Sequence, residues 1–143
     1  DWGQISVADD DPSLDLDDVD GAGPENLNLN VPEPGVSYKM GVHYWNDHGF
    51  GMSTPCVNIF VFGESKLDNH CGCPMVRYDM WEVGTIAWPS QTVDLWTCDG
   101  QAPPPAGAPW PDRPCGGEVN KLEDGSACNK VIMHDYEPEM FVY

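Results

Sequence analysis

The sequence predicts an all-β fold, an antiparallel β-sandwich of the immunoglobulin-like or jelly-roll-like kind. Apolar and polar residues alternate over several short segments, and turn-forming residues recur about every ten residues. No long segment carries the helical period of about 3.6 residues. The 143 residues suffice for one domain. We expect residues 1–97 to form the sandwich and residues 98–143 to form a Pro- and Cys-rich extension packed on the same domain.

The first predicted elements surround an aspartate-rich segment. Residues 4–7 (QISV) suit a short edge strand. Residues 9–25 should form a loop, because Asp, Gly and Pro are disfavoured in strands and helix interiors. Residues 26–31 alternate asparagines with Leu27, Leu29 and Val31, which is typical of a half-buried strand.

The middle of the chain carries the strongest strand signals. After a turn at residues 32–35, residues 36–45 place Val36, Tyr38, Met40, Val42 and Tyr44 on one face of a strand. A loop follows at residues 46–51, and residues 55–63 are rich in β-branched and aromatic side chains. Residues 63–73 are interpreted as a connection. Residues 75–98 should give two or three short strands, interrupted at Gly84 and Pro89.

The C-terminal part differs in composition. Residues 101–114 hold six prolines in fourteen positions and should be extended or turn-like. Cys115 and Cys128 bracket a polar loop of twelve residues, and closing that loop would contribute about 3 kcal/mol to stability. Residues 130–143 suit one or two short strands.

Charge limits the classes of partner. The chain has 24 acidic and 6 basic residues, for a formal net charge of −18. Lys and Arg are the residues that neutralise phosphates, so this balance argues against nucleic acids and anionic membranes as partners. No apolar run approaches the roughly 20 residues of a membrane-spanning helix, so we expect no membrane insertion.

Six cysteines in a short chain rich in Pro and Gly predict disulfides, an oxidising compartment and an extracellular or cell-surface location. Cys71 and Cys73 are two residues apart and would share a face of a strand, so each should bond to another cysteine. Structural zinc is the competing interpretation, but the cysteine spacings do not repeat as CxxC and no histidine completes a finger-like pattern.

The acidic segment predicts a calcium site. Seven aspartates fall within residues 9–20, and an ordered cluster of carboxylates needs cationic charge to offset its repulsion. Alternating acidic residues before a glycine suit Ca²⁺, although the spacing is not that of an EF-hand. A solvated acidic face is the alternative, and Mg²⁺ is less suited to an all-protein site. The candidate ligands are Asp11, Asp15, Asp17, Asp18, Asp20, Glu25 and Asp47.

Three motifs carry a resemblance to a known family. The acidic DDVDGAGPEN loop, the GVHYWNDHGFG segment and the VNIFV strand together resemble the YfaP-like family of bacterial secreted and cell-surface β-sandwich domains, over residues 11–97. The resemblance implies a sandwich and an extracytoplasmic setting. The family pattern also includes an upstream strand that this chain does not contain, and the cysteine-rich segment after residue 98 departs from the pattern.

We find no HExxH, GxSxG or nucleotide-binding glycine loop, and no nucleophile paired with a base, so no enzyme is expected. His43 and His48 flank Asp47, and a structural role is favoured for both over metal or base chemistry. We expect a calcium-binding structural subunit that assembles with identical subunits into a fibre, tubule or layer, with strand exchange as one route. The alternative is a calcium-stabilised carbohydrate-binding or adhesion module whose tryptophans and tyrosines stack on a glycan.

Overall fold

The computed structural model describes residues 12–16, 24–98, 121–122 and 124–136. All regular structure in these ranges is β-strand, and every strand pair is antiparallel. The predicted all-β class is therefore confirmed. No described segment is a helix with the length and hydropathy of a membrane span.

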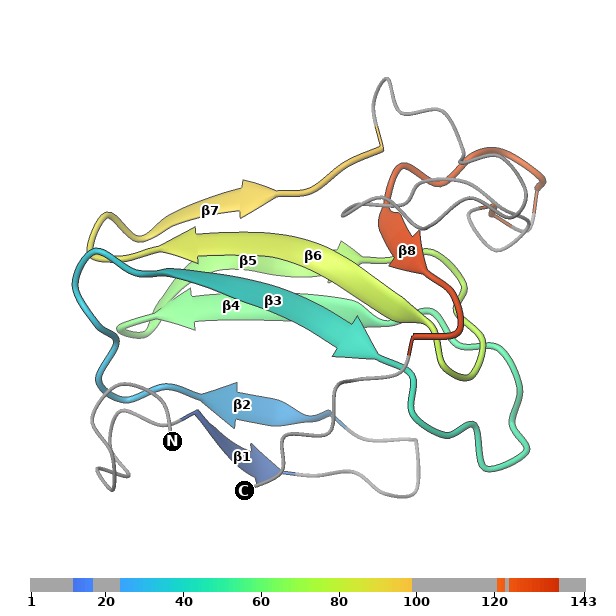
Figure 1. The fold of residues 1–143 in the computed structure, drawn as a ribbon, viewed down its shortest axis with the longest axis horizontal. Helices are drawn as coiled ribbons and strands as arrows, with labels where there is room; N and C mark the ends of the chain where they lie inside the picture. Colours follow the sequence, from blue (N-terminus) through green and yellow to red (C-terminus); the bar gives the residue numbers. More distant parts are fainter. Residues whose placement is uncertain (1–11, 17–23, 99–120, 123, 137–143) are drawn as a thin grey trace.

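The main sheet is built on one long central strand, β6 (Met80–Ala87). Strand β3 (Ser37–His43) pairs along one side of β6 from end to end. On the other side, β7 (Thr92–Leu95) pairs with residues 84–87 and β8 (Val131–Met133) pairs with residues 80–82. The predicted strands at 36–45 and in the C-terminal part are thus present, and β6 organises all of them (Figure 1).

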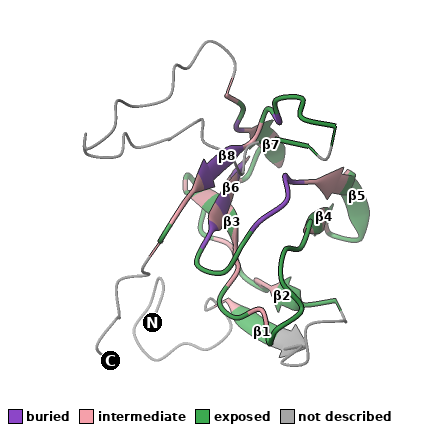
Figure 2. Ribbon diagram, turned by 90° about the vertical axis from the view of Figure 1, so that its right-hand side faces the viewer, coloured by how far each residue is buried: buried purple, intermediate pink, exposed green. Residues whose placement is uncertain are grey.

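A hairpin of β4 (Cys56–Val61) and β5 (Glu64–Cys71) covers one face of this sheet. Figures 1 and 2 show the hairpin as a separate layer. Val57 and Leu67 from the hairpin and Met40, Val42, Tyr44 and Leu95 from the sheet side pack around the buried core of Cys73, Met75, Trp81, Val83, Cys128 and Ile132. Burial is concentrated on β6, β8 and the segment that leads from β5 to β6 (Figure 2). The described second layer has two strands, so a full sandwich stays a prediction.

The predicted connection at residues 63–73 is wrong, because most of it is strand β5. Its side chains are largely polar, the residues at 64, 65, 68 and 69 are exposed, and Leu67 packs against the core. The outer surface of the hairpin faces solvent, so β5 tolerates the polar residues that made it resemble a loop. The prediction that Gly84 interrupts a strand is also wrong, since β6 runs through it.

A third, small sheet joins β1 (Ser13–Leu16) to β2 (Asn26–Asn28). Part of the aspartate-rich segment is therefore a strand, where a loop was expected. The predicted half-buried face after it is present only in part, because Leu29 is half-buried but Leu27 is 67% exposed and Val31 is 54% exposed. Among the described residues, no buried side chain of the core comes from this hairpin.

Two disulfides have both of their cysteines among the described residues. Cys56 bonds to Cys71 across the β4–β5 hairpin, and Cys73 bonds to Cys128 inside the core. The prediction that Cys71 and Cys73 bond to other cysteines is confirmed. The prediction that a disulfide between Cys115 and Cys128 closes a loop is wrong, because the pairing of β8 with β6 brings Cys128 into the core beside Cys73. Cys98 is disulfide-bonded as well, and no described cysteine is free.

Candidate functional site

Most of the predicted calcium ligands lie outside the described residues. Asp11, Asp17, Asp18 and Asp20 fall in undescribed ranges, and for Asp15 the structure describes the backbone in β1. Glu25 is exposed and immediately precedes β2, whose Asn26 pairs with Leu16. The aspartates at 17, 18 and 20 therefore belong to the chain that connects β1 to β2, with Glu25 at its end.

Asp47 lies in a different loop, after β3. Its Oδ1 accepts a hydrogen bond from the Gly49 amide at 3.1 Å, and its carbonyl accepts one from the Phe50 amide at 2.7 Å. These bonds shape the turn, as short acidic side chains commonly do. Within the described ranges, no three Asp, Glu, His or Cys side chains form a group that could hold a metal ion. The calcium site remains a prediction.

The histidines of the HYWNDHGFG segment do not form a site together. The His43 ring packs edge-on against Trp45 and Tyr136, with ring centroids 5.9 and 5.4 Å away. His48 is exposed in the following turn, where its amide donates to Asn46 Oδ1 at 3.1 Å. The His48 bond is made by its backbone amide, so the structural role expected for the two side chains stays a prediction.

Two loops at one end of the β3–β6 ladder expose large apolar side chains. The loop after β3 and the loop before β6 are joined by backbone hydrogen bonds between Tyr44 and Asp79, between Tyr78 and Tyr44, and between Ser53 and Met75. The apolar side chains exposed on these two loops, here called the Trp45 cluster, are Trp45, Phe50, Met52, Val76 and Tyr78. Trp45 and Phe50 are 64% and 79% exposed, so the packing of the domain uses little of their surface.

Tyr78 is held in an unusual conformation within this cluster. Its φ is +70°, a region that bulky L-residues rarely occupy. Its amide donates to Tyr44 O and its carbonyl accepts from the Tyr136 amide, both at 2.7 Å. The Arg77 guanidinium lies 4.5 Å from the ring centroid of Tyr78 and donates to its hydroxyl at 2.6 Å. The ring itself meets Trp45 edge to face, with the centroids 6.3 Å apart. The surroundings thus fix an exposed aromatic pair in place.

A second apolar surface lies where β4 turns into β5. Phe62 and Gly63 form a two-residue hairpin loop with φ values of +51° and +79°, as a type I′ turn requires. Asn or Asp is favoured at the first of these positions, whereas a bulky residue there is strained. Phe62 is 77% exposed, and its ring lies 5.5 Å from that of Trp88, in the β6–β7 turn. Phe60, two residues earlier on β4, is 63% exposed, and Phe60, Phe62 and Trp88 are here called the Phe62 cluster.

The two clusters lie at opposite ends of the domain. In the β3–β6 ladder, Ser37 pairs with Ala87 and His43 pairs with Met80. Trp88 follows Ala87, whereas Trp45 follows His43 by two residues. Eight residues of β6 separate the two ends, a span of about 26 Å at roughly 3.3 Å per residue. In Figure 1 the β4–β5 turn and the loop after β3 accordingly lie at the left and right of the sheet.

A buried acid was not predicted from the sequence. Asp79 is 1% exposed, with Oδ2 accepting from the Val76 amide at 2.9 Å and Oδ1 lying 2.8 Å from His134 Nδ1. The bonds fasten the loop before β6 to the segment after β8. Since the two residues are 55 positions apart, no local pattern could have paired them.

A second polar pair joins the two layers of the fold. Lys130 Nζ donates to His70 Nε2 at 2.8 Å, and the His70 ring lies 5.7 Å from that of Trp81. Because an ammonium group can only donate, the imidazole must be neutral here. Burial and the charge of Lys130 lower the pKa of His70, and burial lowers the pKa of Lys130. The pair is therefore stable only while His70 stays unprotonated.

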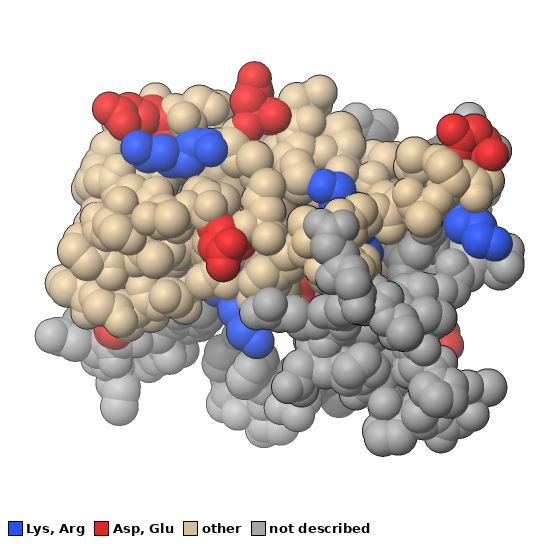
Figure 3. Space-filling model, turned by 90° about the horizontal axis from the view of Figure 1, so that it is seen from above, with Lys and Arg blue, Asp and Glu red and all other residues tan. Residues whose placement is uncertain are grey.

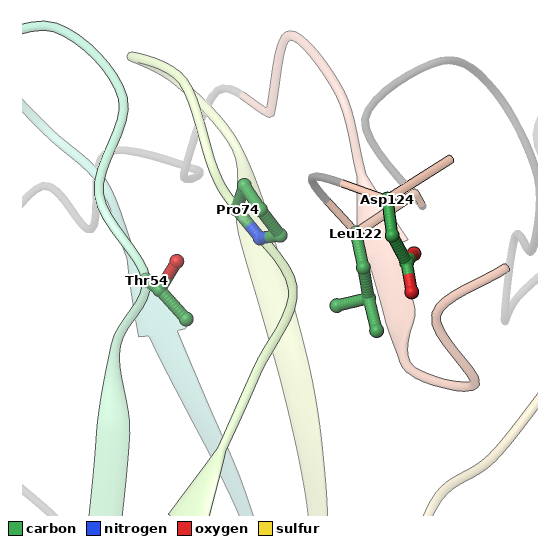
Figure 4. A pocket seen from close by; sticks show the side chains of 4 residues that line it. All are labelled: Thr54, Pro74, Leu122 and Asp124. Carbon is green, nitrogen blue, oxygen red and sulfur yellow. The ribbon is translucent and has the colours of Figure 1, made fainter. Parts of the chain in front are cut away.

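The described residues also line an open hollow of about 370 Å³ between Thr54, Pro74, Leu122 and Asp124 (Figure 4). Its one charged group, Asp124, already accepts from the Ser126 side chain and amide, and these bonds lower the pKa of the carboxyl. Ligand sites usually present several convergent polar groups in an enclosed cavity. This hollow has neither property and is not a candidate site.

Comparisons with protein-family models, with curated proteins and with solved structures find no match for this chain. The resemblance of its motifs to the YfaP-like family therefore stays a prediction from the sequence.

Proposed function

We propose that this protein is a secreted, calcium-binding structural subunit that assembles with copies of itself outside the cell. The observation that carries the proposal is the balance of apolar residues in the described ranges. Nine hydrophobic residues are buried, whereas eleven large hydrophobic side chains are at least 38% exposed. Soluble monomers rarely leave apolar patches of more than a few hundred Å² in water, and larger patches mark interaction sites.

Disulfides and charge support the same proposal. The Cys56–Cys71 and Cys73–Cys128 bonds suit an oxidising, extracytoplasmic compartment. A net charge of −18 opposes the association of identical chains. On the face in Figure 3 the described acidic side chains lie apart from one another, and the densest acidic sequence is residues 9–20. Calcium bound by that segment would lower the repulsion between subunits.

The test is sedimentation velocity and electron microscopy of the oxidised full chain with calcium, with magnesium and with excess chelator. We expect large, regular assemblies with calcium and their dissociation on chelation. Substituting Asp17, Asp18 and Asp20 with Asn should abolish the calcium response. A matched variant, Asp68→Asn, Asp94→Asn and Asp135→Asn, removes the same charge from exposed positions elsewhere and should keep it. A chain that stays monomeric at high concentration with calcium would refute the proposal.

Exposed aromatic rings favour a second candidate, a calcium-stabilised carbohydrate-binding or adhesion module. Trp45 and Tyr78 lie together, exposed, beside the cationic Arg77, and aromatic faces with nearby polar groups suit sugar rings. A glycan array separates the two functions. Saturable binding that is lost in Trp45→Ser, by a chain that remains monomeric with calcium, would favour the binding module.

A further inference from the structure

We propose that the Trp45 cluster of one copy docks on the Phe62 cluster of the next, so that the subunits join head to tail. This inference rests on the proposed self-assembly and names the surfaces that make it. The occupant of each surface is a second copy of this chain.

The first argument is the position of Phe62. A Phe in the first position of a type I′ turn, at φ +51°, costs about 1 kcal/mol or more in backbone strain, and Asn would fit without that cost. The ring gains little within the domain in return, because it is 77% exposed and has one aromatic neighbour. Violations of a local rule without a folding benefit occur mainly at functional sites. Tyr78, at φ +70°, is also in an unfavourable backbone conformation, but its hydrogen bonds to Tyr44 and Tyr136 hold it within the domain, so the argument rests on Phe62.

The second argument is area. Large aromatic side chains offer roughly 150–250 Å² each. With the observed exposed fractions, the Trp45 cluster presents on the order of 500 Å² of apolar surface, and Phe60 and Phe62 of the other cluster present on the order of 300 Å². A standard interface buries about 1,600 Å² in total, of which roughly 57% is non-polar, or about 900 Å². The two clusters together, with about 800 Å², come close to the apolar area that one such contact needs.

The third argument is symmetry. The two clusters consist of different residues and lie at opposite ends of β6. A contact between two different surfaces is heterologous, and when the rotation between subunits does not close a ring it continues as an open filament. The rise per subunit would be close to the length of the β6 strand plus its end loops.

The test uses the full oxidised chain with calcium and two variants. Phe62→Asn removes one ring and places the favoured residue in the turn, so folding stability should be kept or raised while association weakens. Trp45→Ser removes the anchor at the other end. Each substitution should raise the dissociation constant of the contact between subunits by about 30-fold or more, which is the effect of losing a hot-spot residue. Leu122→Ser, at an exposed residue outside both clusters, is the control and should assemble normally.

Mixing the two variants makes the test specific. Each variant alone should sediment as a monomer, whereas an equimolar mixture should form heterodimers, because one native contact is restored and both outer ends are blocked. If both variants form the same assemblies as the wild-type chain, the head-to-tail contact is refuted but the proposed function is not. Two assembly-defective variants that do not rescue each other would also overturn it. A wild-type chain that never assembles would refute the proposed function itself, and the inference with it.

Discussion

Removal of the Cys73–Cys128 disulfide should destabilise the domain about twice as much as removal of Cys56–Cys71. The two bonds close loops with sequence separations of 55 and 15 residues. Loss of the unfolded-state constraint is worth about 4 and 3 kcal/mol, respectively. Cys73 is fully buried and Cys128 is 9% exposed, so truncating these two to Ala adds roughly 1 kcal/mol each for the space left behind. The expected totals are about 6 and 3 kcal/mol.

Equilibrium unfolding in urea under non-reducing conditions measures this difference. Fluorescence of the buried Trp81 and Trp96 reports on the core. The double variants Cys73→Ala/Cys128→Ala and Cys56→Ala/Cys71→Ala each lose one bond and two sulfur atoms, and they differ in loop length and in burial, the two factors that the prediction uses. At about 3 °C per kcal/mol for a domain of this size, the melting temperatures should fall by roughly 20 °C and 10 °C. Equal losses, or a larger loss for the hairpin pair, would refute the view that Cys73–Cys128 locks β8 to the core.

Three further predictions follow from the sheet and its polar pairs. Gly84→Ala should cost at least about 3 kcal/mol in urea unfolding, since a Cβ there would collide with the backbone of β7. Asp79→Ala should cost about 3–5 kcal/mol by the same measurement, because the His134 side chain and the Val76 amide lose the buried carboxylate that they contact, and Asp79→Asn should cost less. The lowered pKa of His70 means that the unfolded chain binds its proton first, so stability should be full above about pH 6.5 and decline as the pH falls below it. His70→Gln should flatten that decline, and an unchanged pH profile would contradict the assignment.

The strands that alternate clearly could be predicted from the sequence, and those whose role depends on a distant partner could not. Residues 36–45 and 55–63 gave β3 and β4 because one face of each is apolar. Strand β5 was missed because its outer surface faces solvent, and because Phe62 is not a residue that signals a turn. Gly84 was misjudged for a related reason. The glycine serves the close approach of β7 rather than a break in the chain.

The same limit applies to the candidate site. The exposed aromatic pair of Trp45 and Tyr78 comes from loops 33 residues apart, and its formation depends on the β3–β6 register. The positive φ of Tyr78 also has no sequence signature. The aspartate-rich segment, by contrast, is continuous in the sequence and can be recognised there, but residues 17–20 lie outside the described ranges.

Because β7 and β8 lie along the same edge of β6, the chain leaves that edge after Leu95 and returns to it at Val131. The strand pairing before residue 99 and after residue 120 therefore does not depend on the number of residues between them. Closing a flexible loop costs only about 0.6 kcal/mol more when the loop doubles in length. Insertions between residues 99 and 120 that keep every cysteine should therefore be tolerated by the strand pairing, whereas deletions that remove a cysteine should not, because Cys98 is disulfide-bonded. Such insertions, a grafted tag for example, would leave the pairing of β7 and β8 with β6 unchanged.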